Sequence, residues 1–487
     1  MKLKDLLAGV SLIDISKNEE EEIQGIAYSS KDVQPGFLFA ALKGEKKDGF
    51  EFIEEALLKG AEVILSEKPK PQNFEKNWIH VHDAREALAL CSANFYSHPS
   101  QNMKVIGITG TKGKTTTTYL LEEILKKSEY IPGVIGTVSY RGPKINIPAQ
   151  RTTPEAPDLQ KMMREMLDKG VTHCLIEVSS HALELKRVLG IGFDIAIFSN
   201  LSGEHLDYHL SMERYFEAKK KLFFLNHKKR IAVINQDDPW GKKLISEFPG
   251  VITYGLEAQA NIRGEKYKLA EKGIELAVKY AGGKFTVTSS LLGKPNLYNI
   301  LASVATALTL NVPVSTIQDG ITALKKIPGR FEKIENSFGL HIFVDYAHTD
   351  DALRNLLETA KELAPRRIIL VFGAGGDRDK SKRERMGEVA GGMADWTILT
   401  NDNPRSEDPL SIISAIEKGI KKARTRNYKI LPDRRKAIAH ALSIGEKGDY
   451  ILIAGKGHEN YQIIQDKVFP FSDAEVIRSI LKKMEAN

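Results

Sequence analysis

The sequence predicts an α/β protein of about three domains, in which mostly parallel sheets are covered by helices. Its 487 residues correspond to about three domains at ~150 residues each. Hydrophobic residues make up 42% and aromatic residues 8% of the chain, which is typical of proteins that fold around apolar cores. Short apolar runs alternate with helical stretches, and two polar breaks separate three parts of the chain.

Residues 1–100 are predicted to form a small mixed α/β domain. Strands are expected at Phe37–Leu42 and Ala61–Leu65, and helices at Phe52–Lys59 and Ala84–Tyr96. A polar stretch with a proline, Ser97–Asn102, then breaks the pattern and is a good linker candidate.

Residues 101–328 are predicted to form a central domain around a parallel sheet. A β-branched strand, Lys104–Thr109, is followed by a loop of Gly, Lys and Thr and by the helix Thr116–Lys127. Two further strands, Cys174–Val178 and Asp194–Phe198, each follow a helical stretch. This βαβ series favours parallel strands covered by helices.

Residues 329–487 are predicted to form a Rossmann-like α/β domain, which begins within the second break, Ile327–Arg330. Four strands are expected, at His341–Asp345, Arg367–Phe372, Trp396–Thr400 and Tyr450–Ala454. Each ends in a polar or glycine-rich loop. Because ligands of open parallel sheets bind beyond the carboxyl ends of the strands, these four loops are candidate walls of a site.

Charge and cysteine content exclude several classes of protein. The chain has 70 Lys and Arg against 63 Asp and Glu. The resulting net charge of +7 is too small for a dedicated nucleic-acid binder, but it suits the binding of an anionic substrate. Cys91 and Cys174 form no Cys-x-x-Cys motif, which argues against a disulfide scaffold or a zinc finger. The N-terminal apolar stretch is interrupted by Asp5 and Asp14 and no apolar run exceeds strand length, so we expect a cytoplasmic protein without membrane insertion.

The strongest motif is the glycine-rich loop Gly107–Thr116, placed between a strand and a helix. Glycines let backbone N–H groups close around phosphate oxygens, Lys114 would reach the β- and γ-phosphates, and the Thr115 hydroxyl would bind Mg²⁺. The first glycine of the usual GxxxxGK[ST] pattern would fall at Ile108, so the strict pattern fails. The alternative is a glycine turn with a solvated lysine. The context favours a P-loop ATPase domain that uses ATP and Mg²⁺.

A P-loop needs a metal site, and two strand ends offer candidates for it. Glu177 ends one predicted strand, and His205 and Asp207 follow another. Each residue alone is more often polar surface, but their position beside a P-loop favours metal binding.

Further motifs share an order and a spacing that are highly specific. They are Gly110–Thr115, Glu177–His181, Asn200–His209, Asn296, Asn299, Gly329–Arg330 and Asp345–Thr349. In these motifs the chain resembles the Mur ligase family, ATP-dependent amide-forming enzymes of peptidoglycan synthesis, across all three predicted domains. The resemblance is greatest to members that add a diamino acid to UDP-N-acetylmuramoyl-L-alanyl-D-glutamate, in the segments Gly375–Lys380, Asp402–Arg405 and Gly455–Glu459.

The resemblance implies a role for each matching residue. ATP would be held by Gly110, Thr111, Lys112, Gly113, Lys114, Thr115, Thr116, Asn299, Arg330, Asp345 and His348. Two Mg²⁺ ions would be held by Thr115, Glu177, His205 and Lys219, the last as a carbamate. The UDP-sugar dipeptide would contact Ser30, Thr152, Thr153, Ser179 and Arg187. The diamino acid would contact Arg378, Asp402, Asn403, Pro404, Arg405, Gly455 and Glu459, and the implied catalytic residues are Lys114, His205, Lys219 and Arg330.

The implied reaction transfers the γ-phosphate of ATP to the side-chain carboxylate of D-glutamate, and an amine then attacks the acyl phosphate. Arg405 favours meso-2,6-diaminopimelate as the acceptor, with L-lysine as the alternative. A folylpolyglutamate-synthetase-like ligase and a non-enzymatic nucleotide switch are the rival classes. We expect a monomer acting on small molecules.

Four positions depart from the family pattern. They are Ser29, Lys31, Leu185 and Asp350. Ser29 and Lys31 flank Ser30 where the family often has Asp-Ser-Arg, and Leu185 stands where a glutamine can contact the substrate. Asp350 replaces a proline after His348 and Thr349.

Overall fold

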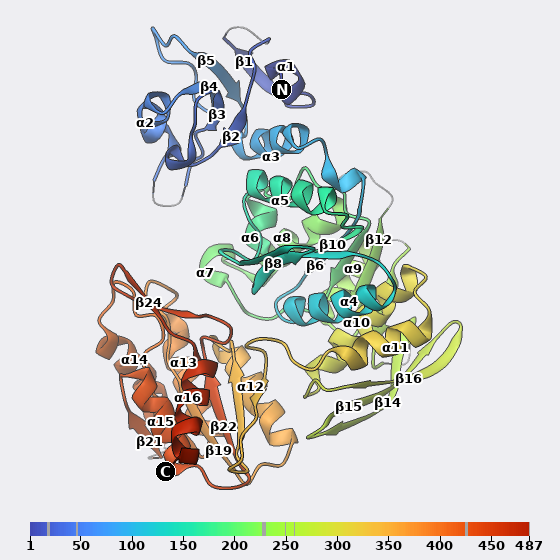
Figure 1. Cartoon of the computed structure of the whole chain (residues 1–487), viewed down its shortest axis with the longest axis vertical. Helices are drawn as coiled ribbons and strands as arrows, with labels where there is room; N and C mark the ends of the chain where they lie inside the picture. The colour runs from blue at the N-terminus through green and yellow to red at the C-terminus, as the bar shows by residue number, and fades with distance from the viewer. Residues whose placement is uncertain are drawn as a thin grey trace. The chain divides into compact units, whose positions relative to one another are not determined.

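The computed structural model describes residues 1–16, 20–44, 47–225, 230–248, 250–257, 259–423 and 427–486. Helices and strands alternate along much of this part of the chain, as predicted, although some strands follow one another directly (Figure 1). The chain divides into two compact units, of which the first comprises Met1–Leu201, Glu213–Tyr254 and Ala302–Pro313. The second comprises Ser202–Met212, Gly255–Leu301 and Val314–Asn487.

The N-terminal part of the first unit is a five-stranded sheet in the order β1-β5-β4-β3-β2. The strands are β1 (Leu12–Ile15), β2 (Gly25–Ala27), β3 (Phe37–Ala40), β4 (Ala61–Ser66) and β5 (Asn77–Val81). β1 runs antiparallel to β5 and the others pair in parallel, which confirms a mixed sheet. Apolar side chains form one core cluster with α3 (Ala84–Phe95) and another with α2 (Ile53–Leu58).

The glycine-rich loop lies in a second sheet of the same unit. Its parallel core has the order β13-β12-β11-β6-β10-β7. These strands are β6 (Lys104–Thr109), β7 (Pro132–Ile135), β10 (His173–Glu177), β11 (Ile195–Phe198), β12 (Ile231–Asn235) and β13 (Ile252–Gly255). Helix α4 (Lys114–Lys127) begins two residues earlier than predicted, because Gly113 adopts a φ of 89° and turns the chain directly into the helix.

Residues 101–328 also contain antiparallel strands that were not predicted from the sequence. In the first unit β7 continues into β8 (Ser139–Gly142) and β9 (Ile145–Pro148). In the second unit β14 (Ile262–Ala270), β15 (Gly273–Tyr280) and β16 (Gly283–Ser289) form a meander. The predicted parallel sheet is therefore confirmed for its core, and the central region is mixed overall.

The second unit contains a six-stranded sheet in the order β17-β18-β22-β19-β20-β21. The strands are β17 (Glu332–Ile334), β18 (His341–Asp345), β19 (Arg367–Phe372), β20 (Trp396–Leu399), β21 (Tyr428–Ile430) and β22 (Asp449–Ala454). All pairs are parallel except that of β17 with β18. One core cluster includes side chains of α12 (Asp350–Glu362), α13 (Ser381–Met393) and α14 (Pro409–Lys422). The other includes side chains of α15 (Arg434–Ile444) and α16 (Asp473–Ala486), as expected of a Rossmann-like domain.

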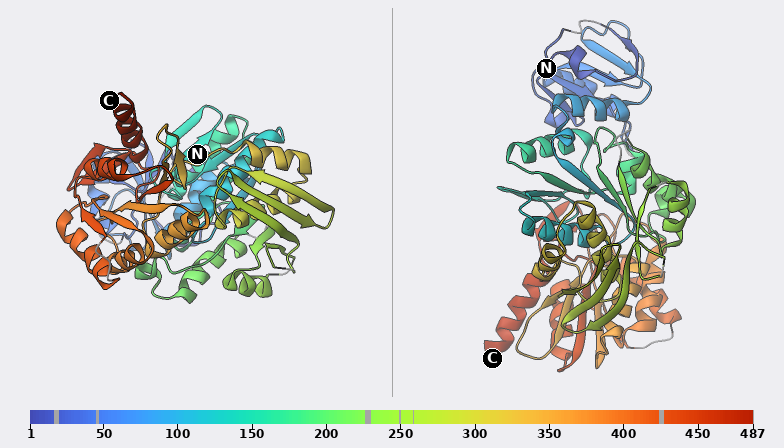
Figure 2. Two further views of the ribbon diagram at one scale, coloured as in Figure 1. Left: turned by 90° about the horizontal axis from the view of Figure 1, so that it is seen from below. Right: turned by 90° about the vertical axis from the view of Figure 1, so that its right-hand side faces the viewer.

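The remaining elements lie between these strands or at the ends of the sheets, and Figure 2 shows the whole chain from two further sides. The helices are α1 (Leu3–Leu6), α5 (Ala156–Asp168), α6 (Ser180–Glu184), α7 (Leu206–His209), α8 (Met212–Phe224), α9 (Pro239–Glu247), α10 (Pro295–Thr309) and α11 (Val314–Ala323). Single 3-10 turns occupy Ser30–Asp32, Gly49–Phe52 and Pro99–Gln101, and β23 (Tyr461–Ile464) pairs with β24 (Lys467–Pro470). Cys91 and Cys174 are both buried and free. Within the described residues, no helix combines the length and apolar character that crossing a membrane requires.

Candidate active site

The glycine-rich loop between β6 and α4 contacts the residues that directly follow the neighbouring strand β11. Gly110 has a φ of 140°, and a Cβ there would lie 1.9 Å from Ser199 Oγ, so only glycine fits. Thr111 N donates to the Asn200 carbonyl (2.8 Å) and Lys112 N to Asn200 Oδ1 (2.9 Å). This arrangement presents the amino end of α4 to an anion, as a phosphate-binding loop requires.

Lys114 folds its amine back over this loop. Its Nζ donates to the carbonyls of Gly110 (2.8 Å) and Thr111 (3.0 Å). An ammonium at this point, beside the amino end of a helix, is placed to neutralise phosphate charge.

Glu177 forms the centre of an oxygen-rich corner next to the loop. Its side chain is 1% exposed, and Oε2 accepts from Thr115 Oγ1 (3.0 Å) and Thr137 Oγ1 (2.7 Å). Oε1 accepts from Thr137 N (3.1 Å), and a Cβ on Gly136 would lie 2.3 Å from that oxygen. A buried carboxylate among hydroxyl oxygens fits a hard cation such as Mg²⁺. Thr137 was missed by the sequence analysis, although it follows β7 at the same sheet edge.

Lys219, on α8, is buried beside the same loop. Its side chain is 1% exposed, its Nζ donates to the Gly110 carbonyl (2.9 Å), and it lies 4.6 Å from the ring centre of Tyr215. Lys114 donates to the same carbonyl oxygen. The structure therefore brings Lys114, Thr115, Glu177 and Lys219 to one end of the sheet. Within the described residues there is no group of three or more His, Cys, Asp and Glu side chains suited to a metal.

Four of the five residues expected at the UDP-sugar dipeptide lie together near this corner. Thr153 Oγ1 donates to the Glu177 carbonyl (2.7 Å) and accepts from Ser179 N (3.1 Å). Arg187 Nη1 donates to the Thr153 carbonyl (3.1 Å), and Thr152 Oγ1 lies 3.1 Å from Thr137 Oγ1. The fifth residue, Ser30, instead donates to Glu55 (2.9 Å) in the N-terminal sheet.

Three arginines surround one carboxylate at this place. Glu155 is 6% exposed. Its Oε1 lies 2.7 Å from Arg151 Nη1 and 2.8 Å from Arg187 Nη2, and its Oε2 lies 3.7 Å from Arg85 Nη1. Burial lowers the pKa of the Arg187 guanidinium, which Glu155 opposes. Three cations against one anion leave an excess of positive charge that suits an anionic substrate. Arg85 and Arg151 were missed; the only signal in the sequence was that Arg151 precedes Thr152.

In the second unit, the end of β18 gathers three of the residues expected at ATP. Asp345 accepts from Phe331 N (2.7 Å) and Ala347 N (2.8 Å), which ties the turn at Arg330 to the strand end. The Arg330 guanidinium lies 4.9 Å from the Tyr346 ring centre. His348 Nδ1 lies 2.8 Å from the Tyr346 carbonyl.

Two other expected residues of this unit lie on separate elements. Asn299, on α10, donates to Asn296 Oδ1 (2.9 Å). His205 is exposed, has a φ of 59°, and precedes α7. Glu204 beside it lies 4.0 Å from His348 Nε2.

The residues expected at the diamino acid lie at the ends of β19, β20 and β22. Asn403 Nδ2 donates to Glu459 (2.9 Å), and Asn403 Oδ1 accepts from Lys456 Nζ (3.1 Å). Lys456 is fully buried and also contacts Glu459 (3.0 Å). A Cβ on Gly455 would lie 2.5 Å from Asp402 Oδ2, so the two loops touch. Sequence reasoning missed Lys456 because nothing in the sequence separates its buried amine from a solvated one.

The two expected arginines of this site differ in their contacts. Arg405 Nη1 donates to the Gly376 carbonyl (2.8 Å). Pro404 before it lies against the same loop, Gly373–Lys380 between β19 and α13, which we call the glycine loop. Arg378 is exposed on that loop. Nearby, burial lowers the pKa of Lys382, an effect that the carboxylates of Glu204 and Asp402 oppose.

A buried ion pair contacts the backbone at the ends of β20 and β22. Arg434 and Asp473 are both fully buried, joined by bonds of 2.8 and 2.7 Å, and Arg434 Nη2 also donates to the Ala454 carbonyl (2.9 Å).

We expect Asp473→Asn to lower the free energy of unfolding by ~3–5 kcal/mol, because it leaves a buried guanidinium unpaired. Chemical denaturation measures this loss. Asp168→Asn, in the exposed Arg164–Asp168 pair, should cost less than ~1 kcal/mol, and an equal loss in both variants would contradict the assignment.

Comparisons with known proteins agree on one family. Sequence models of the family match residues 22–96 ("Mur ligase family, catalytic domain"), 108–307 ("Mur ligase middle domain") and 329–457 ("Mur ligase, glutamate ligase domain"). Together these matches cover more than half of the chain.

Individual relatives match over the full length. A protein from Alkaliphilus metalliredigens named UDP-N-acetylmuramoyl-L-alanyl-D-glutamate--2,6-diaminopimelate ligase is 43% identical, over 99% of this chain and 98% of its own. A protein of the same name from Caldanaerobacter subterraneus is also 43% identical, over 100% of both chains. A solved structure of a ligase with this name has a TM-score of 0.70 at 32% identity and covers 100% of this chain and 99% of its own.

Proposed function

The chain belongs to the Mur ligase family, and on that premise we propose that it is an ATP-dependent ligase that joins 2,6-diaminopimelate to the D-glutamate of UDP-N-acetylmuramoyl-L-alanyl-D-glutamate. The observation that carries the proposal is full-length identity of 43% to relatives with this name, together with the loop geometry around Lys114. The acceptor that we propose is the meso isomer.

The proposed reaction has two steps, and side chains of the protein would assist the transfer of phosphate. Transfer of the γ-phosphate to the D-glutamate side chain converts a poor leaving group into phosphate, and the acceptor amine then attacks the acyl carbon and expels phosphate. Lys114 and Arg330 would neutralise the charge that develops during transfer, and the loop amides would hold the phosphates. Mg²⁺, when bound by Thr115 and Glu177, supplies further neutralisation of phosphate charge. His205 and a carbamylated Lys219 are the proposed ligands of a second ion.

The proposed division of labour follows the chain. Residues 1–100 would bind the UDP-sugar, residues 101–328 ATP, and residues 329–487 the amino acid. The arginines around Glu155 support the binding of an anionic substrate beside Thr152, Thr153, Ser179 and Arg187. We propose a cytoplasmic monomer that acts on small molecules and not on nucleic acid.

One assay tests the reaction class. Purified protein is incubated with ATP, Mg²⁺ and UDP-muramoyl dipeptide, with meso-diaminopimelate or L-lysine as acceptor, while phosphate release and the tripeptide product are measured. We expect both signals only when all three substrates and Mg²⁺ are present. Phosphate release that ignores the dipeptide and the amino acid would support a nucleotide switch instead, and activity with a folate substrate would support a folylpolyglutamate-synthetase-like ligase.

The variant Arg405→Ala tests which amino acid the enzyme prefers as acceptor. Lysine and diaminopimelate differ by one distal carboxylate, which a planar guanidinium can bind through two hydrogen bonds. Lysine would leave this group desolvated and unpaired at a cost of ~2–5 kcal/mol, a preference of roughly thirty-fold or more. We expect Arg405→Ala to raise the KM for meso-diaminopimelate by about that factor while barely changing the poor use of lysine. Equal efficiency with both acceptors in the unmodified enzyme would rule out this assignment.

A further inference from the structure

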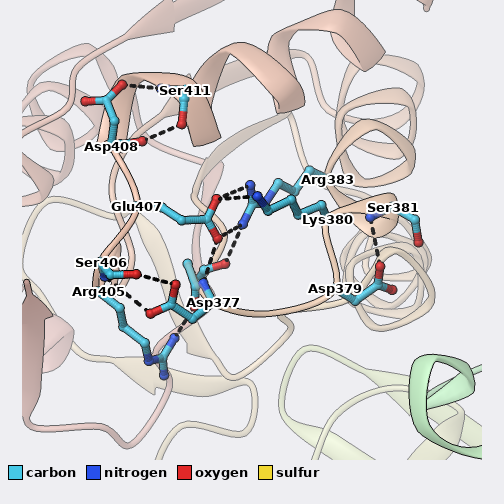
Figure 3. Close-up of polar contacts among 12 residues, drawn as sticks. Asp377, Asp379, Lys380, Ser381, Arg383, Arg405, Ser406, Glu407, Asp408 and Ser411 are labelled. Atoms are coloured by element: carbon cyan, nitrogen blue, oxygen red, sulfur yellow. Dashed lines mark hydrogen bonds and ion pairs between the residues drawn. The ribbon is translucent and has the colours of Figure 1, made fainter. Parts of the chain in front are cut away.

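An ion pair links the start of helix α13, which follows the loop that carries Arg378, to the loop that carries Arg405. Arg383, on α13, donates to Glu407 through Nη1 (2.9 Å) and Nη2 (2.8 Å). The side chain of Arg383 is 4% exposed and that of Glu407 is 15% exposed. Figure 3 shows this pair between the glycine loop and the loop that follows Arg405.

Each partner of the pair also binds the backbone of the glycine loop. Arg383 Nη2 donates to the Gly375 carbonyl (3.3 Å), and Glu407 Oε1 accepts from Asp377 N (2.7 Å). Asp377 in turn accepts from Ser406 Oγ (2.6 Å) and Ser406 N (3.3 Å). The two loops are therefore cross-linked on both sides of Gly376.

The peptide between Gly376 and Asp377 connects the ion pair to Arg405. Its N–H donates to Glu407, and its carbonyl oxygen accepts from Arg405 Nη1 (2.8 Å). Because a peptide unit is planar, a bond that holds the N–H also orients the carbonyl on the opposite side. Glu407 thereby determines where Arg405 finds its hydrogen-bond acceptor.

The loops are too close for one of them to move alone. A Cβ on Gly376 would lie 1.9 Å from the Pro404 carbonyl oxygen, and Gly376 N donates to the Asn403 carbonyl (2.9 Å). A rotation of the Gly376–Asp377 peptide would thus displace both the acceptor carbonyl and the backbone that carries Arg405.

We propose that Arg383 and Glu407 are positioning residues for acceptor recognition, which hold the Gly376–Asp377 peptide so that the Arg405 guanidinium faces the distal carboxylate of the incoming diamino acid. This inference rests on the proposed function, because it presumes that the site selects diaminopimelate. Neither residue needs to touch a substrate. Their loss changes acceptor choice through Arg405.

The charge state of Glu407 makes the pair permanent under assay conditions. The Arg383 guanidinium, opposed by burial, lowers the pKa of Glu407 to about 2. A depressed carboxylate pKa gives an ion pair that is complete above the ordinary value near 4.5 and is lost only as pH falls towards 2. The effect of removing the charge should therefore be the same throughout the neutral range of pH.

Steady-state kinetics of Glu407→Gln test the proposal. We expect the KM for meso-diaminopimelate to rise at least ~10-fold, because a small misplacement of a binding group is costly. The KM values for ATP and UDP-muramoyl dipeptide, and kcat/KM for L-lysine, should change less than ~3-fold. Arg383→Lys keeps the charge but not the two-pronged contact, so it should lie between the wild type and Glu407→Gln.

A double-mutant cycle separates positioning from simple support of the fold. If Glu407 acts through Arg405, adding Glu407→Gln to Arg405→Ala should raise the KM for meso-diaminopimelate little further. Additive effects of the two changes would overturn the proposal.

A partly buried ion pair elsewhere in the same sheet serves as the control. Asp449, fully buried, accepts from Arg367 (2.6 and 3.1 Å) where β19 and β22 begin, at the opposite end of these strands. Asp449→Asn should lower stability and leave the preference between the two acceptors unchanged. If Glu407→Gln behaves in the same way, Arg383 and Glu407 are structural only and the proposal is wrong.

The outcomes distinguish this inference from the proposed function. A wild type without preference for meso-diaminopimelate would contradict the proposed acceptor before any variant is made. A wild type with the preference, which Glu407→Gln retains, would contradict only the positioning role. Should Glu407→Gln not fold, Ser406→Ala decides, since it removes one exposed link to Asp377 and should weaken the preference ~2–3-fold. An unchanged preference in Ser406→Ala would then overturn the proposal.

Discussion

Lys114→Ala is expected to abolish turnover, with kcat lower by at least ~10³-fold, a loss in the range found when a group that neutralises transferring phosphate is removed. Lys114 lies where the loop meets α4, and its amine donates to the carbonyls of Gly110 and Thr111. Because alanine is a good helix former at the start of α4, the fold should survive. Tripeptide formation at saturating substrates measures the loss, and the thermal shift caused by an ATP analogue should shrink.

The same helix provides the control for this variant. Lys127 is exposed in the last turn of α4, so Lys127→Ala removes an equal charge far along the helix from the loop. It should keep full activity. If Lys114→Ala retains more than about a tenth of wild-type kcat, the loop does not act as a phosphate-binding loop in the reaction.

Lys219→Ala is expected to lose most activity, on the order of 10²-fold or more, and to regain part of it with added short carboxylic acids. An ammonium buried to 1% exposure shares the Gly110 carbonyl with Lys114, so two like charges meet in one place. Carbamylation would replace this cation with an anionic oxygen ligand, which Mg²⁺ prefers. Acetate or propionate would supply the missing carboxylate in the space that alanine leaves.

Two results would contradict the proposal that Lys219 is carbamylated. Full activity of Lys219→Ala would return this residue to a structural role, and an inactive variant that no carboxylic acid rescues would show that the amine itself is needed. Lys221→Ala, which removes an exposed lysine two residues away that pairs with Glu184, is the matched control and should behave as wild type. Mass spectrometry of the wild type for the mass of one added CO₂ gives a readout apart from activity.

The sequence alone predicted those features that depend on neighbouring residues in the chain. β6, β18 and β19 begin and end where they were expected, because each is a run of five or six mostly apolar residues closed by a polar or glycine turn. The glycine-rich loop was recognised because its spacing between a strand and a helix is itself the signal. The rule that ligands bind beyond strand ends also indicated the loops after β19, β20 and β22.

The tertiary structure alone decided which distant residues meet. Thr137 reaches Glu177 because β7 pairs with β10, and Lys456 reaches Asn403 across 53 positions of the chain. The pair of Arg383 and Glu407 likewise spans 24 positions, and neither residue differs in sequence from an ordinary surface charge. Such contacts depend on strand order and on how deeply each charge is buried. Local periodicity carries neither kind of information, since it reports which face of an element is apolar and not which element packs against it.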